Sequence, residues 1–282
     1  MLELIHAWTT VGGPPGFRTV SRTPDMSDAT AELLITRSGL DVCYPGVARP
    51  VIAHRTLHMD GRLMSVLTRI SQTLGPSPER PGRIAHHIVL TADQRPDYGP
   101  VDLLARGSFL TSFTEPEKVE QFQLPKSVEP ADTVGIDEAW IDLIRMRLAS
   151  RKCTTILAPP TLRCDRVLAS IAAAMPELGW LMTFVLGTDQ HPDTALLRVV
   201  EIGSPAADRL SCTSEGLIFS LADTPPQHPK TASSEAGPGE PDQPTPRRLE
   251  SAPGIPTAML VLGGMALIAV VIAMAILGGW LQ

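Results

Sequence analysis

The chain has few aromatic residues, few cysteines and no excess of positive charge. Its 282 residues include four cysteines and carry a formal net charge of −6, and only 4% of them are aromatic. Proteins that neutralise phosphates usually show a basic excess, so this balance argues against a nucleic-acid partner. No Cys-x-x-Cys pair and no Gly-x-x-x-x-Gly-Lys-Ser/Thr motif occurs, which argues against a zinc site and a P-loop. We therefore expect no metal and no cofactor.

The first ten residues, MLELIHAWTT, also lack the features of a signal peptide. A signal peptide needs a basic region followed by an apolar run, and neither is present. Because secretion is not indicated, we expect the four cysteines to be free thiols in a reducing compartment. A disulfide between Cys153 and Cys164 is the alternative.

One long hydrophobic run is present, at residues 257–281, and it contains no charged residue. As a helix it would span about 37 Å, enough to cross a hydrocarbon core of about 30 Å with some tilt. A buried globular helix is the competing interpretation, but the run is apolar on every face. The sequence thus predicts a single-pass protein with a C-terminal anchor. Arg247 and Arg248 precede the run, so the N-terminal portion is expected to be cytoplasmic.

The segment before this run, residues 223–256, contains nine prolines and few apolar residues. Such a composition cannot bury enough surface to fold, so we expect a disordered linker. As a random coil it would hold the preceding residues roughly 30–35 Å from the bilayer on average. Within 257–281, the pairs Ala269/Ala273 and Ala275/Gly279 would permit close helix–helix approach and a weak homodimer.

The remaining sequence predicts an α+β fold with two mixed α/β subdomains, at 1–115 and 135–222. The first is expected to be β-rich, with a β-hairpin over residues 51–70 around Asp60-Gly61, the dipeptide that suits a type I′ turn. Other expected strands lie at 2–9, 83–90, 154–158, 180–186, 195–202 and 217–221. Helices are expected at 27–34, 137–150 and 165–175, loops at 75–82 and 107–134.

Four basic residues of the first subdomain are candidate recognition or structural residues: Arg69, Arg83, His86 and His87. Strand alternation points His86 toward the expected core and His87 to the other face. A buried, hydrogen-bonded imidazole is the leading interpretation of His86, and a ligand or proton-transfer role is the alternative, since histidine titrates near neutral pH. His54 and His58 share a strand face but lie about 13 Å apart, too far to bind one metal ion.

Several short pieces, in order along the chain, resemble the N-terminal domain, type 2, of the GTPase-associated protein family of bacterial conflict and signalling systems. The pieces are Gly16-Phe17, Thr23-Pro24, Tyr44-Pro45-Gly46, the strand at 66–70, the Gly-Arg-x-Ala-His-His segment at 82–87 and the Trp-x-x-Thr-Phe segment at 180–184. The resemblance covers about residues 1–220. Larger relatives continue into further soluble modules, whereas this chain continues into the linker and the apolar run.

The resemblance implies a non-catalytic adaptor that works beside a separately encoded P-loop GTPase or another effector, with Arg69, Arg83, His86 and His87 as structural or recognition residues. The leading hypothesis is therefore a membrane-tethered adaptor that recruits a protein partner and reaches the lipid bilayer through 257–281. The alternative is a hydrolase or transferase that uses His86 or His87 as acid/base, with Arg83 on an anionic group. A purely structural envelope protein is a third hypothesis.

Overall fold

A computed structural model of the chain describes residues 1–9, 16–38, 50–77, 80–112, 120–187, 195–212 and 217–226. The chain divides into two units, Met1–Lys230 and Thr231–Gln282, and every element below belongs to the first unit. Most of the predicted linker, from residue 227 on, and the whole predicted membrane helix at 257–281 lie outside the described residues. Among the helices that the structure does describe, none combines the length and apolar character needed to cross a membrane.

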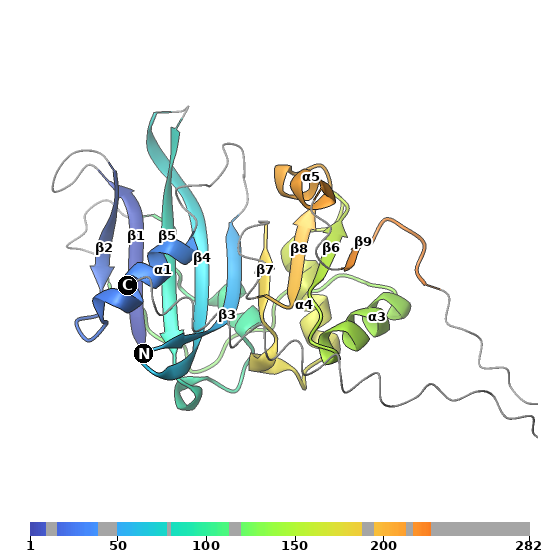
Figure 1. Ribbon diagram of the computed structural model, residues 1–282, viewed down its shortest axis with the longest axis horizontal. Helices are drawn as coiled ribbons and strands as arrows, with labels where there is room; N and C mark the ends of the chain where they lie inside the picture. The colour runs from blue at the N-terminus through green and yellow to red at the C-terminus, as the bar shows by residue number, and fades with distance from the viewer. Residues whose placement is uncertain are drawn as a thin grey trace, which may run out of the picture. The chain divides into compact units, whose positions relative to one another are not determined.

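The first unit is mixed α/β, with one nine-stranded sheet and five α-helices in its described part (Figure 1). The strands are β1 (Leu2–Thr9), β2 (Gly16–Arg22), β3 (Val51–Met59), β4 (Arg62–Ser77), β5 (Arg80–Leu90), β6 (Thr154–Ala158), β7 (Phe184–Leu186), β8 (Leu197–Glu201) and β9 (Leu217–Ser220). The α-helices are α1 (Asp28–Ser38), α2 (Pro100–Arg106), α3 (Glu138–Ala149), α4 (Cys164–Ala174) and α5 (Pro205–Cys212). Across the sheet the order is β2-β1-β5-β4-β3-β7-β8-β6-β9.

Strands β1 to β5 form the antiparallel half of the sheet, and the predicted hairpin, β3 and β4, lies at the side of this half that adjoins β7. Asp60 and Gly61 have φ values of 49° and 75°, the positive values that a type I′ turn requires. This turn fixes the predicted register, in which Leu57 lies opposite Met64. The carboxylate of Asp60 also accepts a hydrogen bond from the Thr30 hydroxyl at 3.1 Å. The hairpin turn is thereby attached to the first turn of α1, where the predicted N-cap Ser27 accepts the Thr30 N–H.

The predicted loop at 75–82 is wrong in most of its length. Strand β4 continues to Ser77 and β5 begins at Arg80, so the two strands extend into a long ribbon with a register irregularity between Thr73 and Ser77. Proline and glycine in this stretch favour a loop locally, but pairing between the two strands overrides that preference. Helix α1 is also longer than predicted and ends at Ser38.

Strands β7, β8, β6 and β9 form the parallel half of the sheet, and one of its predicted strands needs correction. The predicted strand at 180–186 exists only at β7, because Gly179–Leu181 forms a 3₁₀ helix. The Trp180 indole N–H donates to the carbonyls of Pro96 and Tyr98 at 3.0 Å each, which holds this segment outside the sheet. Helices α2 and α5 were not predicted, because seven or eight residues are too few for a clear 3.6-residue period.

Residues from the predicted ranges 1–115 and 135–222 belong to the same sheet, because β3 pairs antiparallel with β7. His54 on β3 reinforces this connection. Its Nδ1 donates to the Met182 carbonyl at 2.8 Å, and its Nε2 accepts from the Ser65 hydroxyl at 3.1 Å. The imidazole also packs edge-on against Trp180. His54 therefore ties the hairpin to the segment that leads into β7.

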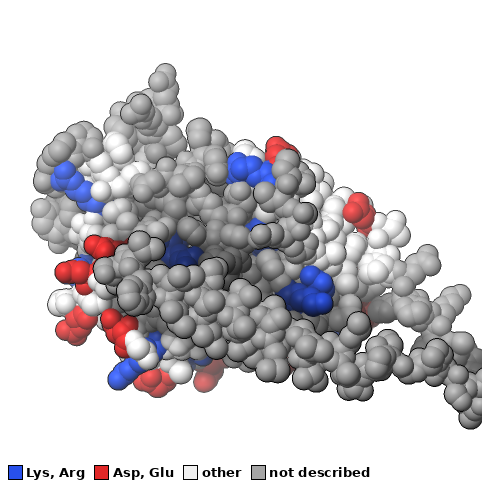
Figure 2. Space-filling view, viewed as in Figure 1, with Lys and Arg blue, Asp and Glu red and all other residues white. Residues whose placement is uncertain are grey.

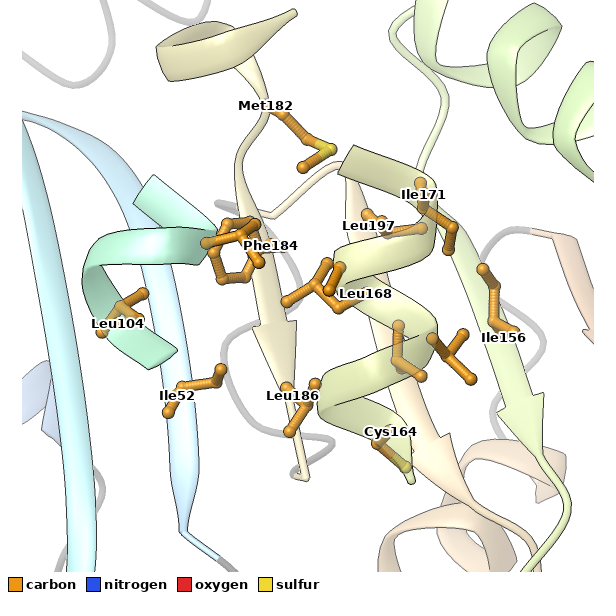
Figure 3. Close-up of a cluster of buried hydrophobic side chains, with 14 of the residues drawn as sticks. Ile52, Leu104, Ile156, Cys164, Leu168, Ile171, Met182, Phe184, Leu186 and Leu197 are labelled. Atoms are coloured by element: carbon orange, nitrogen blue, oxygen red, sulfur yellow. The ribbon is translucent and has the colours of Figure 1, made fainter. Parts of the chain in front are cut away.

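The two faces of the sheet carry different layers. On the face that we call the α4 face, a single apolar core extends from Leu67 and Ile88 of the antiparallel half to residues of β6, β7 and β8, beneath α2 and α4. Figure 3 shows Leu168 of α4 over the strands, close to Phe184 and Leu197. The opposite face, which we call the α1 face, is covered by α1 over β1, β5 and β4 and by α5 over β8 (Figure 1).

The thiol prediction is confirmed for the two cysteines whose side chains are described. Neither Cys153 nor Cys164 is in a disulfide, and Cys164 is buried at the start of α4. The other two cysteine side chains lie outside the described residues.

The hairpin turn provides a test of the fold. A Cβ at Gly61 would meet no atom within 4 Å, so a Gly61→Ala change adds only the strain of positive φ. We expect a loss of about 1 kcal/mol in the free energy of unfolding, measured by urea denaturation. Gly135→Ala is the matched control, because that position is equally open and its φ is not positive. Equal losses in both variants would contradict the turn assignment.

Candidate functional site

The four basic residues that the sequence singled out do not form one cluster. Arg69 and His86 lie opposite each other on neighbouring strands β4 and β5, on the α4 face. Arg83 and His87 project from β5 to the α1 face, because successive residues of a strand point to opposite sides. All but Arg69 are buried. A pocket lined jointly by Arg83 and both histidines is therefore not formed.

His86 is part of a buried polar group that attaches the chain after α2 to the sheet. Its Nδ1 accepts the Leu110 N–H at 2.8 Å, and its Nε2 lies 2.9 Å from the Glu3 carboxylate of β1. The second contact is an ion-pair approach rather than an aligned hydrogen bond. The Glu3 carboxylate also accepts the Phe122 N–H at 3.0 Å. Because Nδ1 accepts the Leu110 N–H, Nδ1 carries no proton, and the N–H of the ring is on Nε2, the atom that faces Glu3.

The surroundings of His86 are apolar, and they give the ring a structural role. Phe109 and Phe122 pack against it with ring centroids 5.2 and 5.7 Å away. The ring lone pair that a general base would use is already occupied by a backbone N–H. The predicted core interpretation of His86 thus fits its contacts better than a proton-transfer role does.

Arg69 likewise attaches the sheet to the helical layer. Its guanidinium donates to the Leu104 carbonyl of α2 at 3.1 Å. Burial lowers the pKa of Arg69, and the nearby carboxylate of Asp165 acts in the opposite direction. The arginine remains charged at neutral pH in any case. Its position therefore serves the packing of α2 and α4 on the sheet.

The α1 face is different, because polar side chains run across its centre. His87 on β5 is paired with Thr68 on β4, which is paired in turn with Ala53 on β3. Ala53 is paired with Val185 on β7, and Val185 with Arg198 on β8. Thr155 follows on β6. Arg55 lies on the same face, two residues after Ala53 on β3. We use the name polar row for the five polar residues His87, Thr68, Arg198, Thr155 and Arg55. Every one of the five is at most 3% exposed.

His87 is the best-defined member of the polar row. Its Nδ1 is 2.9 Å from the Thr68 hydroxyl, and its Nε2 has no hydrogen-bond partner in the part of the chain that the structure describes. Burial lowers the pKa of His87 to about 3, and the charges of His86, Arg55 and His6 act in the same direction. His87 is therefore neutral at physiological pH and lies in a positive electrostatic environment.

The two arginines of the polar row were missed by the sequence analysis. Arg55 and Arg198 are 3% and 2% exposed, although arginine is seldom buried so completely. Both make further contacts within the chain. A signal for Arg55 exists in the sequence: strands β3, β4, β5 and β7 contain five arginines and four histidines but no aspartate or glutamate. In a chain with a net charge of −6 this is a marked local excess of basic residues. Arg198 lies on β8, which also carries Glu201.

Neither a metal site nor a known relative helps to define the candidate site. No group of three or more metal-ligating side chains lies together among the described residues. Comparison of the chain with protein-family models, curated proteins and solved structures finds no match. The candidate site therefore rests on its geometry, and the polar row is its centre.

The His86 group yields a prediction about stability. A His86→Leu change leaves the Glu3 carboxylate and the Leu110 N–H buried without their partner, and we expect a loss of about 3 kcal/mol in the free energy of unfolding. The double variant Glu3→Gln with His86→Leu should lose less than the sum of its two single losses, because the pair is removed together. Strictly additive losses in denaturation experiments would refute the coupling.

The buried histidines yield a prediction about pH. The pKa values of His54 and His87 fall from 6.5 to about 4 and about 3 on folding, so the unfolded chain takes up protons that the folded chain does not. Stability should therefore fall as pH drops below about 6.5, by about 1.4 kcal/mol per pH unit for each histidine. His87→Gln should remove one histidine's share of this slope between pH 6 and pH 4.5.

The matched control for this pH prediction is His58→Gln, at an exposed position of the same sheet. Urea denaturation of the three proteins across that pH range measures the slopes. A His87→Gln slope equal to that of the unmodified chain would show that His87 does not titrate in this way.

Proposed function

We propose that the chain is a non-catalytic adaptor that recruits a protein partner to the cytoplasmic face of a membrane. The observation that carries the proposal is that both candidate acid/base histidines make buried structural contacts. His86 contacts Glu3 and the Leu110 N–H, and His87 is buried against Thr68. Neither described imidazole is presented at the surface, where a substrate would meet it.

The tether is the second element of the proposal, and the sequence supports it. A helix at 257–281 would hold the protein in the bilayer as a single-pass anchor, and the proline-rich residues 223–256 would act as a disordered spacer. Confinement to a surface raises the effective concentration of a recruited partner without any new contact. The small-residue pairs of the anchor would add a weak homodimer contact.

The partner that we propose is a separately encoded P-loop GTPase. This rests on the resemblance of residues 1–220 to the GTPase-associated family.

The proposal predicts two separable results. The tagged full chain, extracted from source membranes, should capture a P-loop GTPase that binds again when both proteins are purified and mixed. Deletion of 257–282 should move the protein to the supernatant in ultracentrifugation and leave that binding intact, because anchor and folded unit act independently.

The anchor and the recruitment of a GTPase would be contradicted by different outcomes. A full-length chain that remains in the supernatant would refute the anchor. Membrane localisation with no GTPase recovered, under conditions in which the chain is folded, would refute the recruiting function.

A further inference from the structure

The chain between α2 and α3 includes a described segment, residues 120–136, that forms neither helix nor strand, and we call it the strap. Only one strap residue, Phe122, is buried, and Leu124, Ala131 and Ile136 pack at the margin of the core. No strap residue forms a backbone–backbone hydrogen bond within the part of the chain that the structure describes. The strap is therefore held on the α4 face by side chains.

The side chains that hold the strap contact its backbone, and they come from β1, α2, α4 and the chain just before α2. Their contacts are Glu3 with the Phe122 N–H at 3.0 Å, Tyr98 with the Pro125 carbonyl at 2.6 Å, Asp102 with the Ala131 N–H at 2.9 Å and Ser170 with the Val134 N–H at 2.8 Å. Main-chain hydrogen bonds supply affinity in the recognition of extended peptides, and a site for selected side chains supplies specificity. The strap is held in the first of these ways.

Phe122 provides the second, because its ring is the side-chain anchor of the strap. The ring packs against His86 and Phe109, with ring centroids 5.7 and 5.2 Å away. Aromatic pairs at such distances contribute more than the area that they bury. A segment that fits the site therefore needs an aromatic residue at this position.

The charge of the strap also suits this site better than the opposite face. The strap carries Glu120, Glu129 and Asp132 but only one lysine. On the α1 face, Asp and Glu side chains gather at the side of the sheet that carries α1, at the lower left of Figure 2. An acidic segment is repelled there, whereas beside α2 the carboxylate of Asp132 meets the Arg106 guanidinium at 2.7 Å.

These attachments leave the strap less stable than the sheet. Every ordered residue costs conformational entropy, and buried or paired groups compensate for that cost. In the strap the only buried residue is Phe122, whereas β4 and β5 pair with each other along most of their length. Local opening begins in segments of the first kind, so the strap should detach while the sheet stays folded.

We infer that the strap occupies, within its own chain, a binding site for an extended, acidic peptide segment of a partner protein. The strap itself shows which ligand fits. The partner segment places an aromatic side chain where Phe122 lies and presents its backbone to Asp102 and Ser170. Because the strap is tethered beside the site, it competes at a high effective concentration and keeps the site closed until it is displaced. The inference needs neither the membrane anchor nor a GTPase, so it stands or fails apart from the proposed function.

The test is binding of a fluorescein-labelled synthetic peptide of residues 120–136 to the purified full chain, followed by fluorescence anisotropy. Phe122→Ala removes the anchor of the chain's own strap and leaves its place open to the phenylalanine of the peptide. We expect this variant to bind the peptide about tenfold more tightly, or better, than the unmodified chain does. A peptide that carries the same change should not bind. Equal affinities of the two proteins, including no binding to either, would overturn the inference.

Two further variants locate the effect. Gln123→Ala is the matched control, because Gln123 is the next strap residue and its side chain is exposed, so peptide affinity should stay that of the unmodified chain. Ser170→Ala combined with Phe122→Ala should weaken peptide binding severalfold relative to Phe122→Ala alone, since it removes the partner of the Val134 N–H. Undiminished binding in the double variant would place the peptide elsewhere and refute the assignment.

Hydrogen exchange of the unmodified chain guards against variants that fail to fold. The amides of Phe122, Ala131 and Val134 should exchange well before those of β4 and β5, because the strap opens without the sheet. Mass spectrometry of peptic fragments measures both sets. Equal protection of the strap and the two strands would show that the strap opens only on global unfolding, and the inference would be wrong.

Discussion

The pairing of β3 with β7 is the constraint on which the rest of the described structure depends. It joins an antiparallel half and a parallel half into one sheet, and it allows one core to run beneath α2 and α4 on both sides of the junction. Only three residue pairs form this contact, so the backbone alone is a weak connection. His54 strengthens it, because its imidazole spans from the hairpin to the Met182 carbonyl just before β7.

Polar side chains on the α4 face make similar connections between the sheet and the rest of the chain. Glu3, His86 and Arg69 each attach irregular or helical chain to the sheet, through the N–H groups of Phe122 and Leu110 and the carbonyl of Leu104. The segment that they hold has no regular structure in its described part, so it cannot satisfy its own backbone groups. Side chains of the sheet satisfy them instead. Such contacts also fix one arrangement of the connecting chain, which apolar packing alone specifies less sharply.

Local signals in the sequence were enough for much of the fold. The Asp60-Gly61 turn determined a register that is correct residue by residue, and the apolar period located α3, for which Asp137 is the N-cap in the structure. Long-range features were not accessible in this way. Pairing of β3 with β7, the extension of β4 beyond Gly75 and the displacement of Trp180 from the sheet all depend on partners distant in sequence.

The candidate site shows the same division between local and long-range information. Alternation along one strand correctly separated His86 from His87, but it could not show that Arg198, more than a hundred residues later, lies in line with His87. What the sequence did contain was the lack of acidic residues in four strands that carry five arginines.

Strand alternation divides the basic residues of these strands into two sets with different roles. Arg69, His54 and His86 project to the α4 face, where each of them makes hydrogen bonds with backbone or hydroxyl groups. Arg55 and His87 project to the α1 face, which also carries Arg198 of the parallel half. The α4 face thus explains how polar side chains of the sheet hold the connecting chain in place, and the α1 face is where the buried arginines Arg55, Arg83 and Arg198 lie.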